Sequence, residues 1–260
     1  MSSKPNTESR EHLEQRKTLI TLHNDIEALE IHVLDPSQLD QFNIQREHMS
    51  LDRDLDSNPR FFTQNTNIPE PDDEVLDETV DILHNKDFFT DPFSRAYALQ
   101  TQWGAYTFSS HWISSKTPWR SMSVSDYRPF RSLYKYDEPS FGVVDIMDVA
   151  GAEYPHITAA TYISLHERDS SSLSRGELLI ILRIMLAQLR KARLLHHTLA
   201  PILILAFVGN RARMLESYFD GKSLLVRSSD FYEFSDRKSA SVSLKTLTEW
   251  YLGDPTGKTV

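Results

Sequence analysis

The segment Pro201-Ile-Leu-Ile-Leu-Ala-Phe-Val208 decides the fold of this chain. From Ile202 to Val208 it has seven apolar residues in a row, a pattern typical of a strand covered on both faces of a sheet. Upstream, Ser174 and Glu177 have the spacing of a helix-start box, in which the two side chains bind free backbone amides of the first turn. The apolar residues that follow have the spacing of a buried helix face: Leu178, Leu182, Met185, Leu189 and Ala192. The sequence therefore predicts a helix that covers a central strand.

Further elements are expected on both sides of this pair. Asp220-Gly221 is typical of a hairpin turn, and Gly253 of the residue after a helix. The patterns predict strands at Phe141–Met147, His156–Leu165, Met214–Phe219 and Leu224–Val226, and a helix near Val242–Leu252. The order strand, strand, helix, strand, strand, strand predicts an α/β fold, with a mixed central sheet of about five strands flanked by helices.

Composition excludes several kinds of site. The chain has no cysteine, which excludes disulfides, cysteine-ligated zinc, iron–sulfur clusters and thiol nucleophiles. The polar N-terminus does not resemble a secretory signal, and the longest apolar run is far shorter than the ~20 residues that cross a bilayer. We expect a soluble intracellular protein of the cytoplasm or nucleus, with no membrane contact. The net charge of -9 disfavours nucleic acid as a partner, although a local basic patch can still act.

The N-terminal part has one amphipathic pattern. Residues 13–34 are expected to be helical until Asp35-Pro36 stops the helix. Its apolar positions form a short heptad-like seam: Leu19, Leu22, Ile26, Leu29 and Val33. Two interpretations stay open. The seam either binds a protein partner or a second copy of the chain, or it docks on the protein's own core.

We expect three regions: an N-terminal extension (1–74) that is helical and loop-rich, an α/β core domain (75–253) and a short tail (254–260). The extension ends in an acidic linker, with six carboxylates among the nine residues from Glu70 to Glu78. Carboxylates in such density suggest a cation site, but the run lacks the pattern of a calcium loop. The alternative is a solvated linker that leads into a helix near Val75–Leu83.

Aromatic residues gather between positions 87 and 136, among them Trp103, Trp112 and Trp119. Aromatic side chains bury large areas and often line binding grooves. The three tryptophans are therefore candidates for an interaction surface. With nearby arginines they could also stack and hold single-stranded nucleic acid, or they could simply close the core.

Candidate catalytic residues are sparse. The chain has neither the G-x-S-x-G turn of a serine hydrolase nor a glycine-rich nucleotide loop. Asp145 stands out, because a carboxylate inside an apolar strand is costly unless it is paired, binds a metal or lies at an accessible end. Asp148 and Glu153 follow closely, and Glu167 lies at the far end of the neighbouring strand. Carboxylates on adjacent strands can converge on a divalent cation that activates water.

The order of these elements resembles the restriction-endonuclease-like fold of the PD-(D/E)xK superfamily. The segment Phe207–Gly221 also resembles a piece common in uncharacterised proteins of filamentous fungi, some of which have that fold. The resemblance implies an Asp on one strand and a Glu/Gln-x-Lys on the next, which together hold Mg²⁺. Asp145 or Asp148 matches the first, but no lysine lies between Lys135 and Lys191, and Glu167 is adjacent to Arg168. A degenerate site is therefore expected.

The sequence thus predicts a non-catalytic interaction or accessory protein on a nuclease-like scaffold, with no cofactor. Two alternatives stay open. The first is a magnesium-dependent nuclease that uses Asp145, Asp148 and Glu167, with Asp145 and Glu167 as metal ligands. The second is an accessory enzyme of fungal small-molecule (secondary) metabolism. A basic set on and after the long helix is also a candidate contact for phosphate groups: Arg183, Arg190, Lys191, Arg193, Arg211 and Arg213.

Overall fold

The computed structural model describes residues 8–52, 56–85, 89–108, 117–122, 124, 133–135, 139–165 and 170–260. Its helices are α1 (Arg10–Glu27), α2 (Pro36–Gln41), α3 (Asp73–His84), α4 (Pro92–Phe108), α6 (Arg175–Leu189), the 3₁₀ turn η2 (Ala192–Leu194) and α7 (Arg237–Tyr251). Its strands are β1 (Val33–Leu34), β2 (Ile44–His48), β3 (Trp119–Met122), β4 (Tyr134–Lys135), β5 (Phe141–Val149), β6 (Ile157–Ile163), β7 (Leu173–Ser174), β8 (Ile202–Val208), β9 (Arg211–Phe219), β10 (Leu224–Ser228) and β11 (Tyr232–Glu233).

The main sheet is mixed and has the strand order β2-β10-β9-β8-β6-β5-β3, with β11 also paired to β9 and β4 to β5. β8 lies inside it, parallel to β6 and antiparallel to β9, and all seven of its residues are buried. This confirms the α/β fold with a mixed central sheet and helices around it. The hairpin is also present, with Gly221 at φ +92° in the turn between β9 and β10. The sheet is larger than expected because both edges add strands.

The long helix connects the two parallel strands at the centre. β6 leads through α6 into β8, and α6 begins at the expected box, where Glu177 N donates to Ser174 Oγ at 2.9 Å and Ser174 N donates to Glu177 Oε2 at 2.7 Å. α6 has 15 residues, and none of the helices in the described ranges is both long and apolar enough to cross a membrane.

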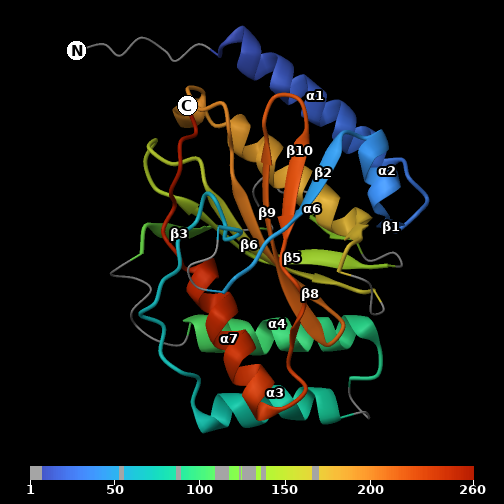
Figure 1. Cartoon of the computed structure of the whole chain (residues 1–260), viewed down its shortest axis with the longest axis vertical. Helices are drawn as coiled ribbons and strands as arrows, with labels where there is room; N and C mark the ends of the chain where they lie inside the picture. The colour runs from blue at the N-terminus through green and yellow to red at the C-terminus, as the bar shows by residue number, and fades with distance from the viewer. Residues whose placement is uncertain are drawn as a thin grey trace.

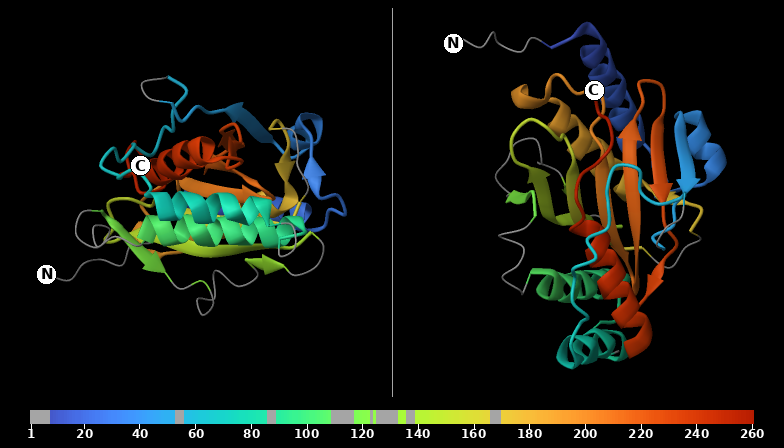
Figure 2. Two further views of the ribbon diagram at one scale, coloured as in Figure 1. Left: turned by 90° about the horizontal axis from the view of Figure 1, so that it is seen from below. Right: turned by 60° about the vertical axis from the view of Figure 1, so that its left-hand side comes forward.

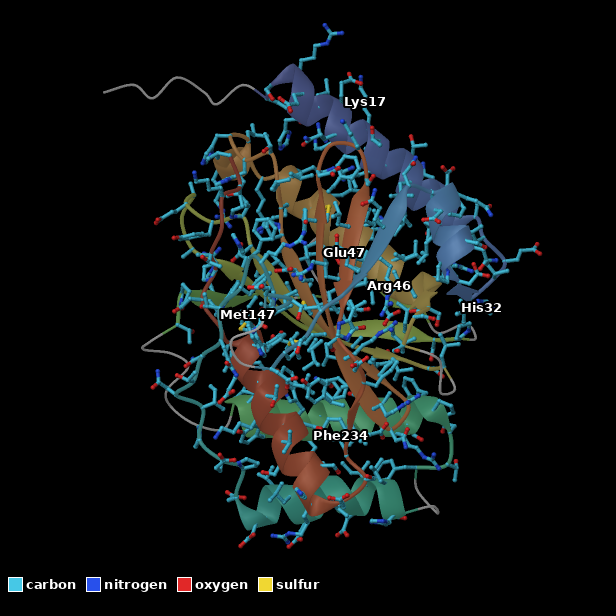
Figure 3. The ribbon with its side chains drawn as sticks, viewed as in Figure 1. Lys17, His32, Arg46, Glu47, Met147 and Phe234 are labelled. Carbon is cyan, nitrogen blue, oxygen red and sulfur yellow. The ribbon has the colours of Figure 1, made fainter. Side chains whose placement is uncertain are left out.

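Helices cover both faces of the sheet (Figures 1 and 2). On one face α6 packs on the strands and α1 packs on the outer side of α6. On the other face α3, α4 and α7 form the second core, in which Phe234 is buried next to α7 (Figure 3). The result is a three-layer α/β/α arrangement with an additional helix over one layer.

Two expectations about the N-terminal part are wrong. The first helix ends at Glu27 instead of Leu34, and Val33–Leu34 pairs with β7 as a short antiparallel bridge. The loop-rich region also contains β2, which pairs in parallel with β10 at the edge of the main sheet. β2 is polar, and one of its side chains, Glu47, accepts from Arg227 Nε at 3.2 Å. Backbone pairing and this ion pair hold it, so hydrophobic periodicity does not reveal it.

Candidate functional site

Asp145 lies at an irregularity of β5, where the register with β6 shifts between Val143 and Asp145. Its Oδ2 accepts a hydrogen bond of 2.7 Å from the hydroxyl of Tyr251 on α7. Burial raises the pKa of Asp145, against the opposing effect of its hydrogen bonds from Tyr251 and Ser121. Asp145 therefore faces the layer of α3, α4 and α7, and its carboxylate is hydrogen-bonded to Tyr251 of that layer.

Asp148 faces the other layer, since side chains an odd number of positions apart alternate between the faces of a strand. Its side chain is only 1% exposed. Three cations surround it: Arg120 Nη2 lies 3.2 Å from Oδ1, and Lys191 Nζ and Arg193 Nη2 lie 2.8 and 2.6 Å from Oδ2. Arg193 Nη1 also donates to the Gly151 carbonyl. Both oxygens of Asp148 are thus occupied by ion pairs.

The structure separates two of the three carboxylates of the nuclease hypothesis. Asp145 and Asp148 point to opposite faces of β5, so they cannot ligate one ion. Glu167, the third residue of that hypothesis, lies outside the described residues. Within the described ranges no group of three or more His, Asp or Glu side chains is placed to hold a metal ion.

We call Arg120, Lys191 and Arg193 the basic cluster. Three positive groups face one carboxylate, which leaves an excess of two positive charges in a chain whose net charge is -9. Burial lowers the pKa of Lys191, and the charges of Arg193 and Arg120 lower it further, while Asp148 acts in the opposite direction. Arg120 comes from the edge strand β3, and the other two follow α6, whose C-terminal end favours positive charge. The cluster is assembled from distant parts of the sequence.

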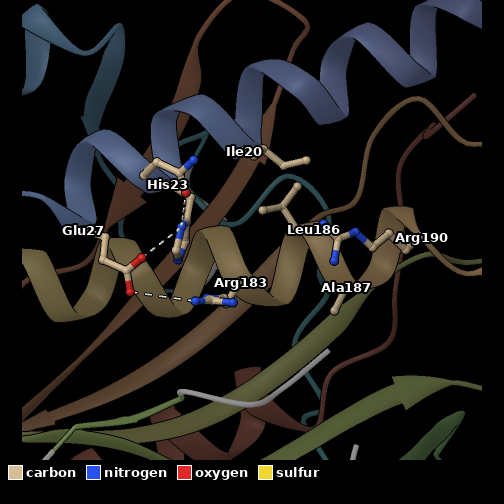
Figure 4. Close-up of a pocket in the computed structure, with 8 residues that line it drawn as sticks. Ile20, His23, Glu27, Arg183, Leu186, Ala187 and Arg190 are labelled. Atoms are coloured by element: carbon tan, nitrogen blue, oxygen red, sulfur yellow. Dashed lines mark hydrogen bonds and ion pairs between the residues drawn. The ribbon is translucent and has the colours of Figure 1, made fainter. Parts of the chain in front are cut away.

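A groove of about 140 Å³ lies between α1 and α6 (Figure 4). Its floor is apolar, and its rim is charged. Glu27 lies between His23 Nδ1, at 3.9 Å, and Arg183 Nη2, at 3.8 Å. Arg190 also lines the groove at the end of α6. The charge of Glu27 compensates one of the two arginines, so the groove carries less excess positive charge than the surroundings of Asp148.

A second hollow of about 270 Å³ lies beside α7. Its lining includes three carboxylates, Asp52, Glu70 and Glu249, and Lys245, which is paired with Glu70. Gln64 Nε2 donates to Glu249 Oε2 at 2.6 Å. This hollow is acidic, so it does not favour an anionic ligand.

The residues predicted to form an interaction surface are largely in the core. Leu19, Leu22 and Ile26 are buried in the cluster that joins α1 to α6, Leu29 packs against that cluster, and Val33 is exposed. The seam therefore docks on the protein's own core, which is one of the two interpretations of its pattern.

Two of the three candidate tryptophans are also buried in the core. Trp103 is fully buried, with its ring 4.8 Å from that of Tyr251, and Trp119 is buried and donates to the Gly253 carbonyl at 2.7 Å. Trp112 lies outside the described residues. Trp103 and Trp119 thus help to close the core, and neither offers a surface for stacking.

Arg211 and Arg213, two members of the basic set, form ion pairs with carboxylates outside the acidic linker. Arg213 pairs with Glu177, and Arg211 with Glu233. The linker is instead paired by α7, where Arg237 contacts Asp73 and Asp77. Lys191 and Arg193 are the members of the set that gather around Asp148.

Comparison of the chain with models of protein families, with curated proteins and with solved structures finds no match. The arrangement around Asp148 therefore has to be judged on its own geometry. The signal in the sequence concerns Asp145, a carboxylate inside a predicted apolar strand that needs partners, and Asp148 is only its near neighbour. It does not identify Arg120, Lys191 and Arg193 as the partners of Asp148.

Proposed function

We propose that this protein is a non-catalytic interaction protein on a nuclease-like scaffold, and that it binds an anionic region of a partner protein at the basic cluster. The observation that carries the proposal is the state of Asp148, which is buried and ion-paired to three cations. A metal ligand has to offer free, ionised oxygens. Here the carboxylate instead holds three cations together, and their charge exceeds its own.

The scaffold is supported by the connectivity around β5. β3, β5 and β6 form an antiparallel meander, and the α6 crossover then places β8 parallel to β6. This includes the strand, strand, helix, strand order on which the resemblance to the PD-(D/E)xK fold rests. On that scaffold the magnesium-dependent nuclease hypothesis would have to combine either Asp145 or Asp148 with Glu167.

Other routes to a partner have less support. Self-association through the N-terminal helix stays a prediction, and it requires Leu19, Leu22 and Ile26 to leave their core positions against α6. The accessory-enzyme hypothesis requires a pocket of ~300–1,000 Å³. The two cavities described above, of about 140 and 270 Å³, are smaller.

Binding of a labelled hexaglutamate peptide at low salt tests the proposal. We expect measurable binding by fluorescence anisotropy, although the net charge of -9 opposes it, because the basic cluster supplies local attraction. Arg120→Gln/Arg193→Gln should weaken binding by about tenfold or more, since two charges near the peptide are lost. Should Arg193→Gln disturb the fold, the exposed Arg120→Gln alone should still weaken it severalfold.

The matched control is Lys17→Gln/Arg237→Gln, which removes the same number of charges away from Asp148. Lys17 points outward from α1 (Figure 3), and Arg237 lies on α7. This control should bind as the wild type does. Equal loss in both double variants would contradict the proposal, and so would Mg²⁺-dependent cleavage of DNA or RNA that Asp145→Asn or Asp148→Asn abolishes.

A further inference from the structure

Resting on the proposed function, we infer that the group recognised by the basic cluster is a phosphoryl monoester on a segment of the partner protein. Three properties of the cluster favour a phosphoryl group as its ligand: the close packing of its charges, the number of positive charges in excess, and the donors that remain accessible.

The positive charges of the cluster are unusually close together. All three cationic groups lie within 3.2 Å of the two oxygens of a single carboxylate. Their nitrogens are therefore gathered around one small anion. Such packing produces mutual repulsion that Asp148 only partly cancels, and a second anion next to the cluster would relieve it.

The excess of two positive charges matches the charge of a phosphoryl monoester, which is about -1.5 to -2 at neutral pH. One carboxylate of a glutamate supplies half of that charge, and two glutamates spread it over a larger distance. A compact dianion is therefore the ligand that neutralises this cluster most completely.

The donors that remain accessible also suit phosphate. Arg120 uses Nη2 for Asp148, and its side chain is 61% exposed, so the rest of the guanidinium faces solvent. The planar fork of arginine binds phosphate oxygens in pairs. Arg193 is 28% exposed, but its Nη1 and Nη2 already donate to the Gly151 carbonyl and to Asp148, and Lys191 is only 11% exposed. Arg120 thus offers the accessible donors, and Arg193 and Lys191 contribute charge close to it.

The other cavities do not compete for this ligand. The groove between α1 and α6 holds Glu27 between His23 and Arg183, and the hollow beside α7 is lined by three carboxylates. Neither offers an uncompensated pair of positive charges. Of these three places, the basic cluster is therefore the one to which the phosphoryl group is assigned.

Nucleic acid is the less suitable source of phosphate. A phosphodiester carries one charge, and a long polyanion would bring many charges near a protein of net charge -9. A short phosphorylated peptide brings the dianion with few further charges. The observations therefore favour a phosphoprotein, and nucleic acid becomes an outcome of the test.

The experiment compares two labelled peptides of equal length and nearly equal charge, one with a phosphoserine followed by a serine and one with two glutamates at those two positions. Affinities are measured with the wild-type chain, Arg120→Gln/Arg193→Gln and Lys17→Gln/Arg237→Gln. Inorganic phosphate and a labelled oligothymidylate form two further arms. We expect the phosphopeptide to bind about tenfold more tightly than the glutamate peptide, because charge-assisted bonds to a compact dianion are stronger. Inorganic phosphate should compete, and only the cluster variant should lose the preference.

The outcomes distinguish a failure of the phosphoryl assignment from a failure of the proposed function. Equal affinity for both peptides, with loss in the cluster variant, overturns the phosphoryl assignment and leaves the proposed function standing. Tighter binding of oligothymidylate that depends on Arg120 and Arg193 overturns it in favour of nucleic acid. Binding that the cluster variant does not alter overturns both.

Discussion

Glu177→Gln is expected to lower the free energy of unfolding by about 3–5 kcal/mol, because it leaves a buried arginine without its counter-charge. The side chains of Glu177 and Arg213 are 1% and 2% exposed, and Arg213 Nη2 lies 2.8 Å from both carboxylate oxygens. Arg213 also lies 4.8 Å from the centre of the Phe231 ring. Glu177 in addition accepts from Ser174 at the start of α6, so one residue links the helix cap to β9.

Urea unfolding followed by circular dichroism measures this loss. Glutamine keeps the size of the side chain and can still serve in a helix-start box, so the substitution tests mainly the charge. Glu14→Gln, which breaks the exposed pair with Lys17, is the matched control and should change stability by less than about 1 kcal/mol. Glu177→Met/Arg213→Met should be less destabilised than Glu177→Gln, since no unpaired charge stays buried. A loss below about 1 kcal/mol for Glu177→Gln would show that the pair is not desolvated as described.

Stability should also fall as the pH is lowered from about 6.5 to about 4, in part because of His156. His156 is fully buried, and its Nε2 lies 2.8 Å from the Thr256 carbonyl. Burial lowers the pKa of His156 from 6.5 to about 4. Below pH 6.5 the unfolded chain binds a proton that the folded protein excludes, so acid favours unfolding. Over the whole window this amounts to about 3 kcal/mol, from about 1.4 kcal/mol for each unit of pKa shift.

The contribution of His156 is obtained from the difference between the wild type and His156→Gln, measured from pH 7.5 to pH 4. Other groups titrate in both proteins and largely cancel, among them Asp145, whose raised pKa acts in the opposite direction. The stability curve of His156→Gln should be flatter by up to about 1.4 kcal/mol per pH unit. His48→Gln is the control for replacing an exposed histidine by glutamine. Parallel curves for His156→Gln would contradict a neutral buried imidazole.

The fold was most predictable where one local signal was sufficient. The Ser174–Glu177 box, the apolar run of β8 and the Asp220-Gly221 turn each specify a structure within a few residues, and all three are present. β2 and the end of α1 were not predictable in this way. Both depend on pairing with distant strands, β10 and β7, and their own residues are polar or short.

The composition of α6 predicts that a second element covers it. α6 is apolar on nearly all sides, and a helix with that pattern is buried all round. It therefore needs a second cover besides the sheet, and the seam of α1 supplies it through Leu19 and Ile26. The heptad-like spacing of that seam is the same for a partner helix and for a helix of the same chain. Periodicity alone cannot separate these two cases.

The candidate site was predictable only in part. The cost of a carboxylate in an apolar strand draws attention to β5, and alternation along a strand already separates Asp145 from Asp148. The partners of Asp148 come from β3 and from the segment after α6, 28 to 45 positions away in the sequence. Their meeting is a product of the tertiary fold, which no local pattern encodes.

Asp148→Asn tests most directly whether the positive charge of the basic cluster attracts the peptide. With the fold checked by circular dichroism, its affinity for the hexaglutamate peptide at low salt should rise by about fivefold. The reason is that the excess charge of the basic cluster grows from two to three, worth about 1 kcal/mol near the surface. A folded Asp148→Asn protein that binds the peptide no better than the wild type would contradict the proposal that this cluster is the binding site.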